Sequence, residues 1–195
     1  KAPVEPGQFV LMDFRCDQSR GMHFIYCLPF SDRDALVEST MFSSQQAPID
    51  FYETAIADWL GKIARITDFE ITRRETGMIP LGFFARHDPA LPGIGANAGA
   101  IRPSSGYAFA FIQKQIDHAL TQIKAGRPLA FETPHRKIDL WMDRIFLSVL
   151  RHQPQIAPRI FSAMASRLNG DEFAMFLSGE ATTGLRLKVI LAMPI

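Results

Sequence analysis

The sequence predicts an α+β fold, with an antiparallel sheet first and helices after it. Three short apolar runs are separated by polar turn residues, which is typical of an antiparallel meander; they are Phe9 to Phe14, Phe24 to Leu28 and Ala35 to Phe42. Later in the chain the apolar residues recur at helical spacing. We therefore expect a sheet-rich region over residues 1–105 and a helical region over residues 106–195, together in one compact unit.

The composition is that of a globular protein, since 47% of the 195 residues are hydrophobic and 21% are charged. The formal net charge of +1 argues against a protein that binds nucleic acid through bulk charge. The two cysteines, Cys16 and Cys27, offer neither a disulfide framework nor metal-ligand spacing, so we expect a reducing compartment and no metal. No apolar run approaches the roughly 18 residues that would predict a membrane-spanning helix.

Two further elements are predicted in the first half of the chain. Asp50 is in position to cap a helix from Phe51 to about Ala64, and the alternation of polar and apolar residues from Ile66 to Arg74 predicts another strand. The proline-containing stretch from Pro80 to Pro92 is expected to be a loop. One face of the helix carries the apolar residues Ile56, Trp59, Leu60 and Ile63.

Three longer helices and two shorter ones are predicted in the second half. The first ends near Gly126, a common stop signal, the second runs from about Lys137 to Leu150, and the third ends at Asn169-Gly170. Glu172 to Leu177 and Leu185 to Leu191 are expected to form the shorter helices. The residues expected to face inward on the longer helices are Phe109, Ile112, Ile116, Ala119 and Ile123, then Ile138, Trp141, Ile145 and Val149, then Ile160, Phe161, Met164 and Leu168.

Glu75 is the first candidate for a catalytic residue. It lies between the strand-like run that contains Phe69 and Ile71 and the apolar turn from Gly77 to Pro80. We expect little water around a carboxylate in such surroundings. Burial favours the protonated form of a carboxyl group, which makes it a proton donor near neutral pH. The alternative for this residue taken alone is a surface carboxylate, because charged side chains are mostly exposed.

Glu38 is a second candidate acid. The alternation of its run puts Leu36 and Glu38 on one face of a strand and Val37 and Ser39 on the other. A carboxylate that shares a face with a leucine is a candidate for a site. A charge on an edge strand is the alternative.

The stretch from Gly93 to Ala98 formally fits the G-x-G-x-x-A pattern of dinucleotide-binding loops. That fingerprint needs a strand before it and a helix directly after it, and here prolines lie on both sides, at Pro92 and Pro103. We expect instead a loop of small residues whose backbone approaches another group closely, with a site for a negative group at the start of the next helix. A simple tight turn is the alternative.

Taken together, these motifs resemble those of the lycopene cyclase family. In the family's acidic motif, written Phe-Leu-Glu-Glu-Thr in plant members, Glu38 matches the first acid and Ser39 stands in place of the second. Arg102 stands where the family has a histidine, and both Arg102 and His23 are expected to be structural or at the periphery of a ligand site. The matching segments run along nearly the whole chain: Leu11 to Phe14, Phe24 to Ser31, Leu36 to Thr40, Glu75 to Pro80, Ala98-Gly99, Pro103 to Tyr107, and Phe176 to Gly179 with Leu185 to Pro194.

The resemblance implies that the chain is the C-terminal part of a flavoprotein. It would be a fragment of an FAD/NAD(P)-binding hydroxylase-like fold that lacks the N-terminal FAD-binding half, and residues 1–105 would bind the substrate and carry catalysis. Reduced FAD would be the cofactor and NADPH its reductant, although the isolated chain is not expected to hold either. The residues that the resemblance places at the flavin are Gly95, Ala98, Gly99, Pro103 and Gly106.

The reaction that the resemblance implies is an acid-catalysed, redox-neutral ring closure at the ends of a linear carotenoid polyene. Glu75 would protonate the terminal double bond, and Glu38 would be the supporting or alternative acid. The protein would be cytoplasmic and would touch the inner membrane peripherally through its apolar C-terminal helices. Two alternatives stay open: a flavin-dependent hydroxylase or halogenase, which would consume oxygen and NADPH, and a non-enzymatic domain that binds apolar ligands.

Overall fold

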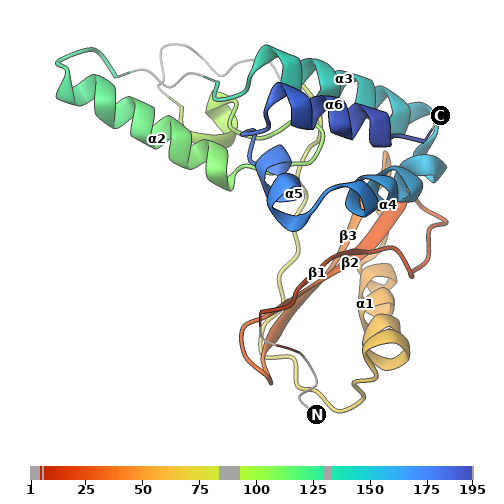
Figure 1. The fold of residues 1–195 in the computed structure, drawn as a ribbon. Helices are drawn as coiled ribbons and strands as arrows, with labels where there is room; N and C mark the ends of the chain where they lie inside the picture. The colour runs from red at the N-terminus through yellow and green to blue at the C-terminus, as the bar shows by residue number, and fades with distance from the viewer. Residues whose placement is uncertain (1–4, 6, 84–92, 130–132, 195) are drawn as a thin grey trace. The chain divides into compact units, whose positions relative to one another are not determined.

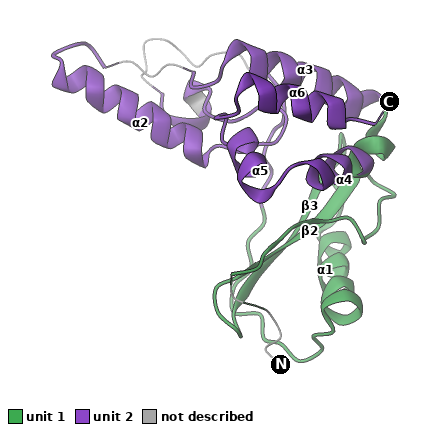
Figure 2. Ribbon diagram, viewed as in Figure 1, with its two compact units in different colours: residues 1–76, 153–158 green, residues 77–152, 159–195 purple. Residues whose placement is uncertain are grey.

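The computed structural model describes residues 5, 7–83, 93–129 and 133–194, and the chain forms two compact units (Figures 1 and 2). Unit 1 comprises residues 1–76 and 153–158, and unit 2 comprises residues 77–152 and 159–195. Each unit has its own cluster of buried apolar side chains. The expected division of roles between residues 1–105 and 106–195 stays a prediction.

Unit 1 is built on a three-stranded antiparallel sheet in the order β1-β2-β3. A short turn joins the second and third strands, in which the side-chain oxygen of Ser31 accepts hydrogen bonds from the backbone N–H groups of Arg33 and Asp34 at 3.2 and 3.0 Å. The predicted meander is confirmed, because the strands are β1 (Val10–Asp13), β2 (Met22–Pro29) and β3 (Ala35–Phe42).

A helix covers one face of this sheet. It begins as α1 (Ile49–Asp58), continues as the π-helical turn η1 (Trp59–Ala64), and ends where Arg65 adopts a left-handed φ of 58°. Asp50 lies within the first turn and the cap position belongs to Pro48, so the predicted cap is wrong. The buried side chains between the helix and the sheet are Ile25, Cys27, Ala55, Trp59 and Leu60.

Residues 65–83 have no regular secondary structure, so the predicted strand from Ile66 to Arg74 is wrong. Alternation specifies a strand only where a neighbouring strand can pair with it and one face can be buried. Here the apolar side chains remain in solvent, with Phe69 47% and Ile71 54% exposed. An exposed ion pair of 3.3 Å between Arg74 and Glu53 ties the segment to α1.

Unit 2 is largely helical and its predicted helices are confirmed. Gly126 follows α2 with a left-handed φ of 68°, as a helix stop requires. Asn169 begins α5 with a capping box, in which its side chain and that of Glu172 each accept a hydrogen bond from the other's backbone N–H. The helices are α2 (Phe109–Lys124), α3 (Lys137–His152), α4 (Ala157–Arg167, whose first two residues belong to unit 1), α5 (Gly170–Leu177) and α6 (Thr183–Ala192), with the short 3₁₀ turn η2 (Gly95–Ala98). A second 3₁₀ turn, η3 (Pro154–Ile156), lies in the residues 153–158 of unit 1.

The inward face predicted for α3 is wrong. Ile138, Trp141 and Ile145 are 44%, 52% and 48% exposed, whereas Asp139 and Asp143 are buried. Both buried aspartates form ion pairs with arginines from other segments. The helix is therefore oriented by two charged anchors, and its apolar stripe points to solvent.

The inward face of α2 is also shifted from the prediction. Phe109 and Ile123 are 69% and 53% exposed, and Phe111 and Gln115 are buried in their place, while Ala119 is buried as expected. Only α4 buries the expected stripe through Ile160, Met164 and Leu168. These residues join Ala181, Leu185 and Val189 in the buried part of unit 2.

Candidate functional site

Glu38 lies on the face of the sheet that points away from α1. Val37 packs against the α1 cluster, while Leu36 and Glu38 are exposed, so the predicted alternation along β3 is confirmed. The hydroxyl of Thr40 donates a hydrogen bond of 2.5 Å to the Glu38 carboxylate. Among the described residues, no cation forms an ion pair with Glu38.

Aromatic rings line this same face of the sheet. In the register of β2 and β3, Tyr26 lies opposite Glu38 and Phe24 lies opposite Thr40. The Phe24 ring stands edge-on to Tyr26 at 5.1 Å and to Phe42 at 5.7 Å. We call this surface the Glu38 face; its members on the two strands are Met22, Phe24, Tyr26, Leu28, Leu36, Glu38, Thr40 and Phe42.

Tyr26 is half-buried between its neighbours on the Glu38 face. Desolvation raises the pKa of the Tyr26 phenol to about 12, and the negative charge of Glu38 adds to the effect. The phenol is therefore neutral at physiological pH. The face combines one ionisable carboxylate with uncharged aromatic rings.

Ser39 belongs to the opposite side of the sheet, with His23. The Ser39 hydroxyl is 2.7 Å from Nε2 of His23, and Nδ1 of that ring is 2.7 Å from the carbonyl oxygen of Asp17. A carbonyl can only accept, which assigns the ring proton to Nδ1 and makes Nε2 the acceptor from Ser39. Burial lowers the pKa of His23. The expected structural role of His23 is confirmed, and any side chain at position 39 points away from Glu38.

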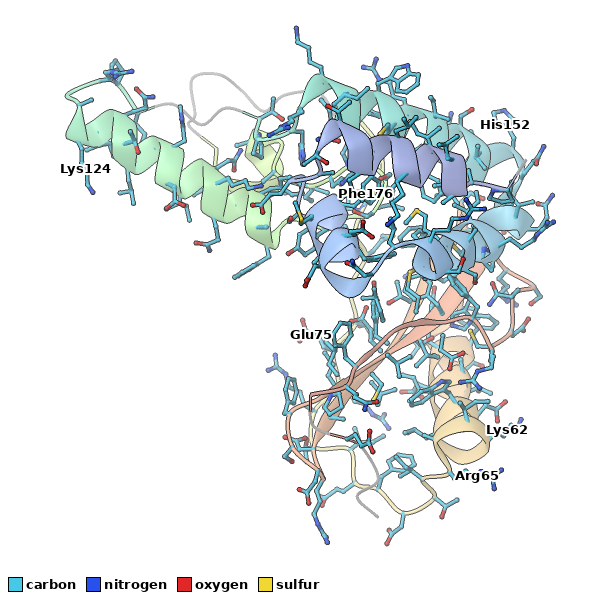
Figure 3. The ribbon with its side chains drawn as sticks, viewed as in Figure 1. Lys62, Arg65, Glu75, Lys124, His152 and Phe176 are labelled. Atoms are coloured by element: carbon cyan, nitrogen blue, oxygen red, sulfur yellow. The ribbon has the colours of Figure 1, made fainter. Side chains whose placement is uncertain are left out.

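Glu75 has surroundings different from those expected. Its side chain is 78% exposed and forms an ion pair of 3.1 Å with Arg73, which is itself 83% exposed. The labelled side chain lies on the segment that has no regular secondary structure (Figure 3). The predicted water-poor environment of Glu75 is therefore wrong for the described chain, because the strand that was to bury the segment does not form. The catalytic role of Glu75 stays a prediction.

The small-residue loop forms the 3₁₀ turn η2 in unit 2. Gly95 and Gly99 adopt left-handed φ angles of 72° and 74° at its two ends. The side chain of Gln115, buried on α2, accepts a hydrogen bond from the backbone N–H of Gly95 at 3.2 Å and donates one to the carbonyl of Ala98 at 2.9 Å. The amide side chain of Gln115 thus fixes both ends of the loop to α2.

The glycines of this region face other parts of the chain. A Cβ on Gly95 would meet Ile112 at 3.7 Å, and one on Gly106 would meet Ile79 at 3.0 Å. The N–H of Gly95 already has a partner, and the carbonyl of Pro103 accepts a hydrogen bond from Gly82 at 3.0 Å. These residues therefore do not by themselves form a cradle that fits a flavin. Their role at a cofactor stays a prediction.

Arg102 is a buried structural residue, as expected. Its guanidinium lies 3.1 Å from the Asp143 carboxylate on α3, donates to the carbonyl of Phe176 at 2.7 Å, and stacks 4.9 Å from the centre of the Phe176 ring. Ser104 donates a further hydrogen bond of 2.7 Å to Asp143. The segment after the small-residue loop is thus clamped onto α3.

A second buried ion pair lies one turn earlier on α3, where Arg186 of α6 contacts Asp139 at 2.7 Å. Sequence reasoning missed Asp139, Asp143 and Arg186. The available signal was the four-residue spacing of the two aspartates, which places them on one helix face, and the position of Arg186 between the apolar residues Leu185 and Leu187.

Two surface hollows among the described residues do not include either candidate acid. One, in unit 2, is lined by Tyr107 and by side chains from Asp171 to Glu180. Another, in unit 1, lies between the β1–β2 connection and α1. In the described ranges, no group of three or more histidine, cysteine, aspartate or glutamate side chains is placed to hold a metal ion.

Comparison with known proteins points to one family. A family model described as "Lycopene cyclase protein" matches residues 1–195. A lycopene beta-cyclase of Paracoccus sp. (strain N81106 / MBIC 01143) is 32% identical over 118 residues, which is 55% of this chain and 30% of that relative. The matched stretch thus spans under a third of the relative's length. No solved structure matches the chain.

Proposed function

Because the chain belongs to the lycopene cyclase family, we propose that it takes part in the acid-catalysed closure of rings at the ends of a linear carotenoid. The observation that carries this proposal is the family match along residues 1–195. The chain would be the C-terminal part of a larger, hydroxylase-like flavoprotein, in which it supplies the sheet and the acids. The enzyme would be an intramolecular lyase or isomerase, because substrate and product have the same atoms.

The proposed reaction conserves atoms and electrons. A carboxylic acid gives its proton to the terminal double bond, whose π electrons form the new C–H bond and leave a carbocation. The π electrons of an internal double bond then attack the cation and form the C–C bond of the ring. A carboxylate finally removes a proton from a neighbouring carbon, and the electrons of that C–H bond become the ring double bond. The proton removed in the last step balances the proton donated in the first, so the reaction consumes no net acid.

We assign the proton transfers to Glu75 and Glu38, with Glu75 as donor and Glu38 as supporting or alternative acid. Protonation of carbon needs a donor in a dry setting. Glu75 is exposed in the described chain, so its use requires that the substrate or another part of the protein cover it. Glu38 already lies beside aromatic rings and has no ion-pair partner among the described residues.

The test is a set of single substitutions in the parent protein, with cyclised products measured by chromatography. Glu75→Gln is expected to abolish cyclisation, and Glu38→Gln is expected to reduce it at least tenfold. Glu70→Gln, an exposed acid in the same irregular segment, is the matched control and is expected to keep full activity. Because the ion pair between Glu75 and Arg73 is exposed, Glu75→Gln should change the free energy of unfolding little. A loss of activity in this variant would therefore not be a folding effect. Normal ring formation by Glu75→Gln would refute its assignment as donor.

The involvement of reduced FAD, with NADPH as reductant, is proposed on the family resemblance alone. Gly95, Ala98, Gly99, Pro103 and Gly106 remain the candidate contacts. Flavin absorbance of the purified parent protein, before and after Gly99→Val, tests this part. Oxygen-dependent consumption of NADPH during turnover would instead favour a hydroxylase or halogenase, because ring closure consumes neither.

We also propose that the protein contacts the cytoplasmic side of the inner membrane through unit 2. No described helix is both long enough and apolar enough to cross a bilayer. The exposed stripe of α3 contains Trp141, and α6 exposes Leu187 and Leu191. On α3 the exposed charged residues are all basic, because both aspartates are buried in ion pairs. Co-sedimentation with anionic vesicles, compared with neutral ones, tests this contact, and Trp141→Ser is expected to weaken it.

A further inference from the structure

We infer that the ring of Tyr26, beside Glu38 on the Glu38 face, is the surface on which the positively charged end of the polyene lies during ring closure. This inference rests on the proposed function and adds a residue that carries no acid. It assigns Tyr26 to stabilising the cation between the two proton transfers.

The first support is the state of the Glu38 carboxylate. It accepts a hydrogen bond from the neutral hydroxyl of Thr40, and no described lysine or arginine forms an ion pair with it. A carboxylate without a counterion on an apolar surface attracts a cation and repels an anion. The charge of the face therefore selects a positively charged occupant.

The second support is the position of Tyr26. Residues directly opposite in an antiparallel pair have Cβ atoms about 4.5–5.5 Å apart, so the ring of Tyr26 lies beside the Glu38 side chain. Its hydroxyl makes no hydrogen bond to another described residue. Phe24 holds the ring edge-on at 5.1 Å and is itself 1% exposed, which restricts the ring's movement.

The third support is the chemistry of the pair. The face of an aromatic ring carries partial negative charge and attracts cations, while a carboxylate supplies a full charge beside it. A carbocation has no hydrogen-bond donors, so polar groups in a pocket would lack hydrogen-bond partners. An aromatic ring beside an anion can stabilise the cation without a hydrogen bond. A neutral apolar ligand would gain nothing from Glu38, and a phosphate or carboxylate ligand would be repelled by it.

The kinetic test compares three variants of the parent protein with lycopene as substrate. Tyr26→Leu removes the π system and is expected to lower kcat about 5- to 30-fold, the range of one cation–π contact, with KM changed less than about twofold. Tyr26→Phe keeps the ring and should stay within about threefold of wild type. Tyr52→Leu, the same change on α1, is the matched control and should leave kcat unchanged.

A binding test needs no turnover and uses the wild-type parent protein. Decyltrimethylammonium, below its critical micelle concentration, is the cationic probe, and 1-decanol, which has the same alkyl chain and no charge, is the neutral probe. The cationic probe is expected to bind at least about fivefold more tightly, and Glu38→Gln is expected to remove that preference. The absence of any preference in wild type would overturn the inference.

The outcomes separate the two proposals. If wild type forms no cyclic carotenoid but prefers the cationic probe, the proposed function is wrong and the cation site stands. If wild type cyclises lycopene and Tyr26→Leu does so at the same rate, the function stands and Tyr26 has no part in it. An equal loss in Tyr26→Leu and Tyr52→Leu would also overturn the inference, because it would show a general packing effect.

Discussion

Two ion pairs of the same length should differ in energy because only one of them is buried. Arg102 and Asp143 are 3.1 Å apart with each side chain 3% exposed, and Arg73 and Glu75 are also 3.1 Å apart but 83% and 78% exposed. Coulomb attraction is weak in water and strong in a protein interior, where an unpaired charge is also costly. We therefore expect Arg102→Ala to be strongly destabilising and Arg73→Ala to be nearly neutral.

The size of the effect follows from what Arg102→Ala leaves behind. The Asp143 carboxylate would keep only the hydrogen bond from Ser104, and the carbonyl of Phe176 would lose its donor. Breaking a buried pair from one side typically costs about 3–5 kcal/mol. Exposed pairs contribute about 0–1 kcal/mol, so Arg73→Ala should fall near zero.

Urea unfolding followed by far-ultraviolet circular dichroism measures the difference. With an m-value of about 2 kcal/mol/M, Arg102→Ala should lower the midpoint of unit 2 by roughly 1.5–2.5 M. The double variant Arg102→Met with Asp143→Leu removes both charges and should recover part of the loss, although the Phe176 carbonyl and the Ser104 hydroxyl still lack these partners. A midpoint shift below about 0.5 M for Arg102→Ala, or no recovery in the double variant, would refute the argument that burial of the charges sets the cost.

Three other predictions concern the surroundings of Asp13, Gly179 and Cys16. The Arg15 side chain donates hydrogen bonds to the Asp13 carboxylate and lowers the pKa of Asp13 to about 2. The ionised carboxylate therefore stabilises the fold above pH 4, and this contribution of about 1–2 kcal/mol should be lost as the pH falls from 4 toward 2. Thermal melts of Asp13→Asn should not show this loss of stability between pH 4 and pH 2. Gly179→Ala should lower the free energy of unfolding by about 1–3 kcal/mol in urea, because the φ of residue 179 is 75° and the new Cβ would lie 2.7 Å from the Phe111 ring. Gly184→Ala is the control and should not destabilise the protein, because no atom lies closer than 4.0 Å to its new Cβ. Partial burial raises the pKa of Cys16 to about 11, so alkylation of Cys16 in the native protein at pH 7 should be slower than in urea. Equal rates would contradict the partial burial of its thiol.

The sheet was predictable because its signals are local. Each strand is a short apolar run bounded by turn residues, β3 adds an alternation of exposed and partly buried residues, and the Ser31 turn supplies its own hydrogen bonds. The segment from Ile66 to Arg74 shows the same alternation, but no strand lies in register to pair with it. Pairing partners are a property of the whole fold, and the local pattern does not contain them.

The orientation of α3 was not predictable from its apolar stripe. The stripe through Ile138, Trp141 and Ile145 looks like the inward face of an amphipathic helix. Arg102 and Arg186, which lie 41 and 47 residues away from their aspartates, turn the other face inward. Ion pairs between distant segments leave only a weak signal in one sequence.

Only those features of the candidate site that depend on local sequence patterns were predictable. The position of Glu38 on a strand face followed from its alternation with Val37, and the structure agrees. The environment of Glu75 depended on a strand that does not form, so its expected burial failed with it. The aromatic neighbours of Glu38 come from another strand, and the pairing register places them there.

The two tryptophans occupy opposite environments, one in each unit. Trp59 in unit 1 is 5% exposed and donates a hydrogen bond of 2.9 Å to Asp13, while Trp141 in unit 2 is 52% exposed. The tryptophan fluorescence of the chain is therefore the sum of the shielded Trp59 and the solvent-accessible Trp141. Iodide should quench Trp141 selectively. The single-tryptophan variants Trp59→Phe and Trp141→Phe would each report on one unit, and would show whether the two units unfold in one step or one after the other.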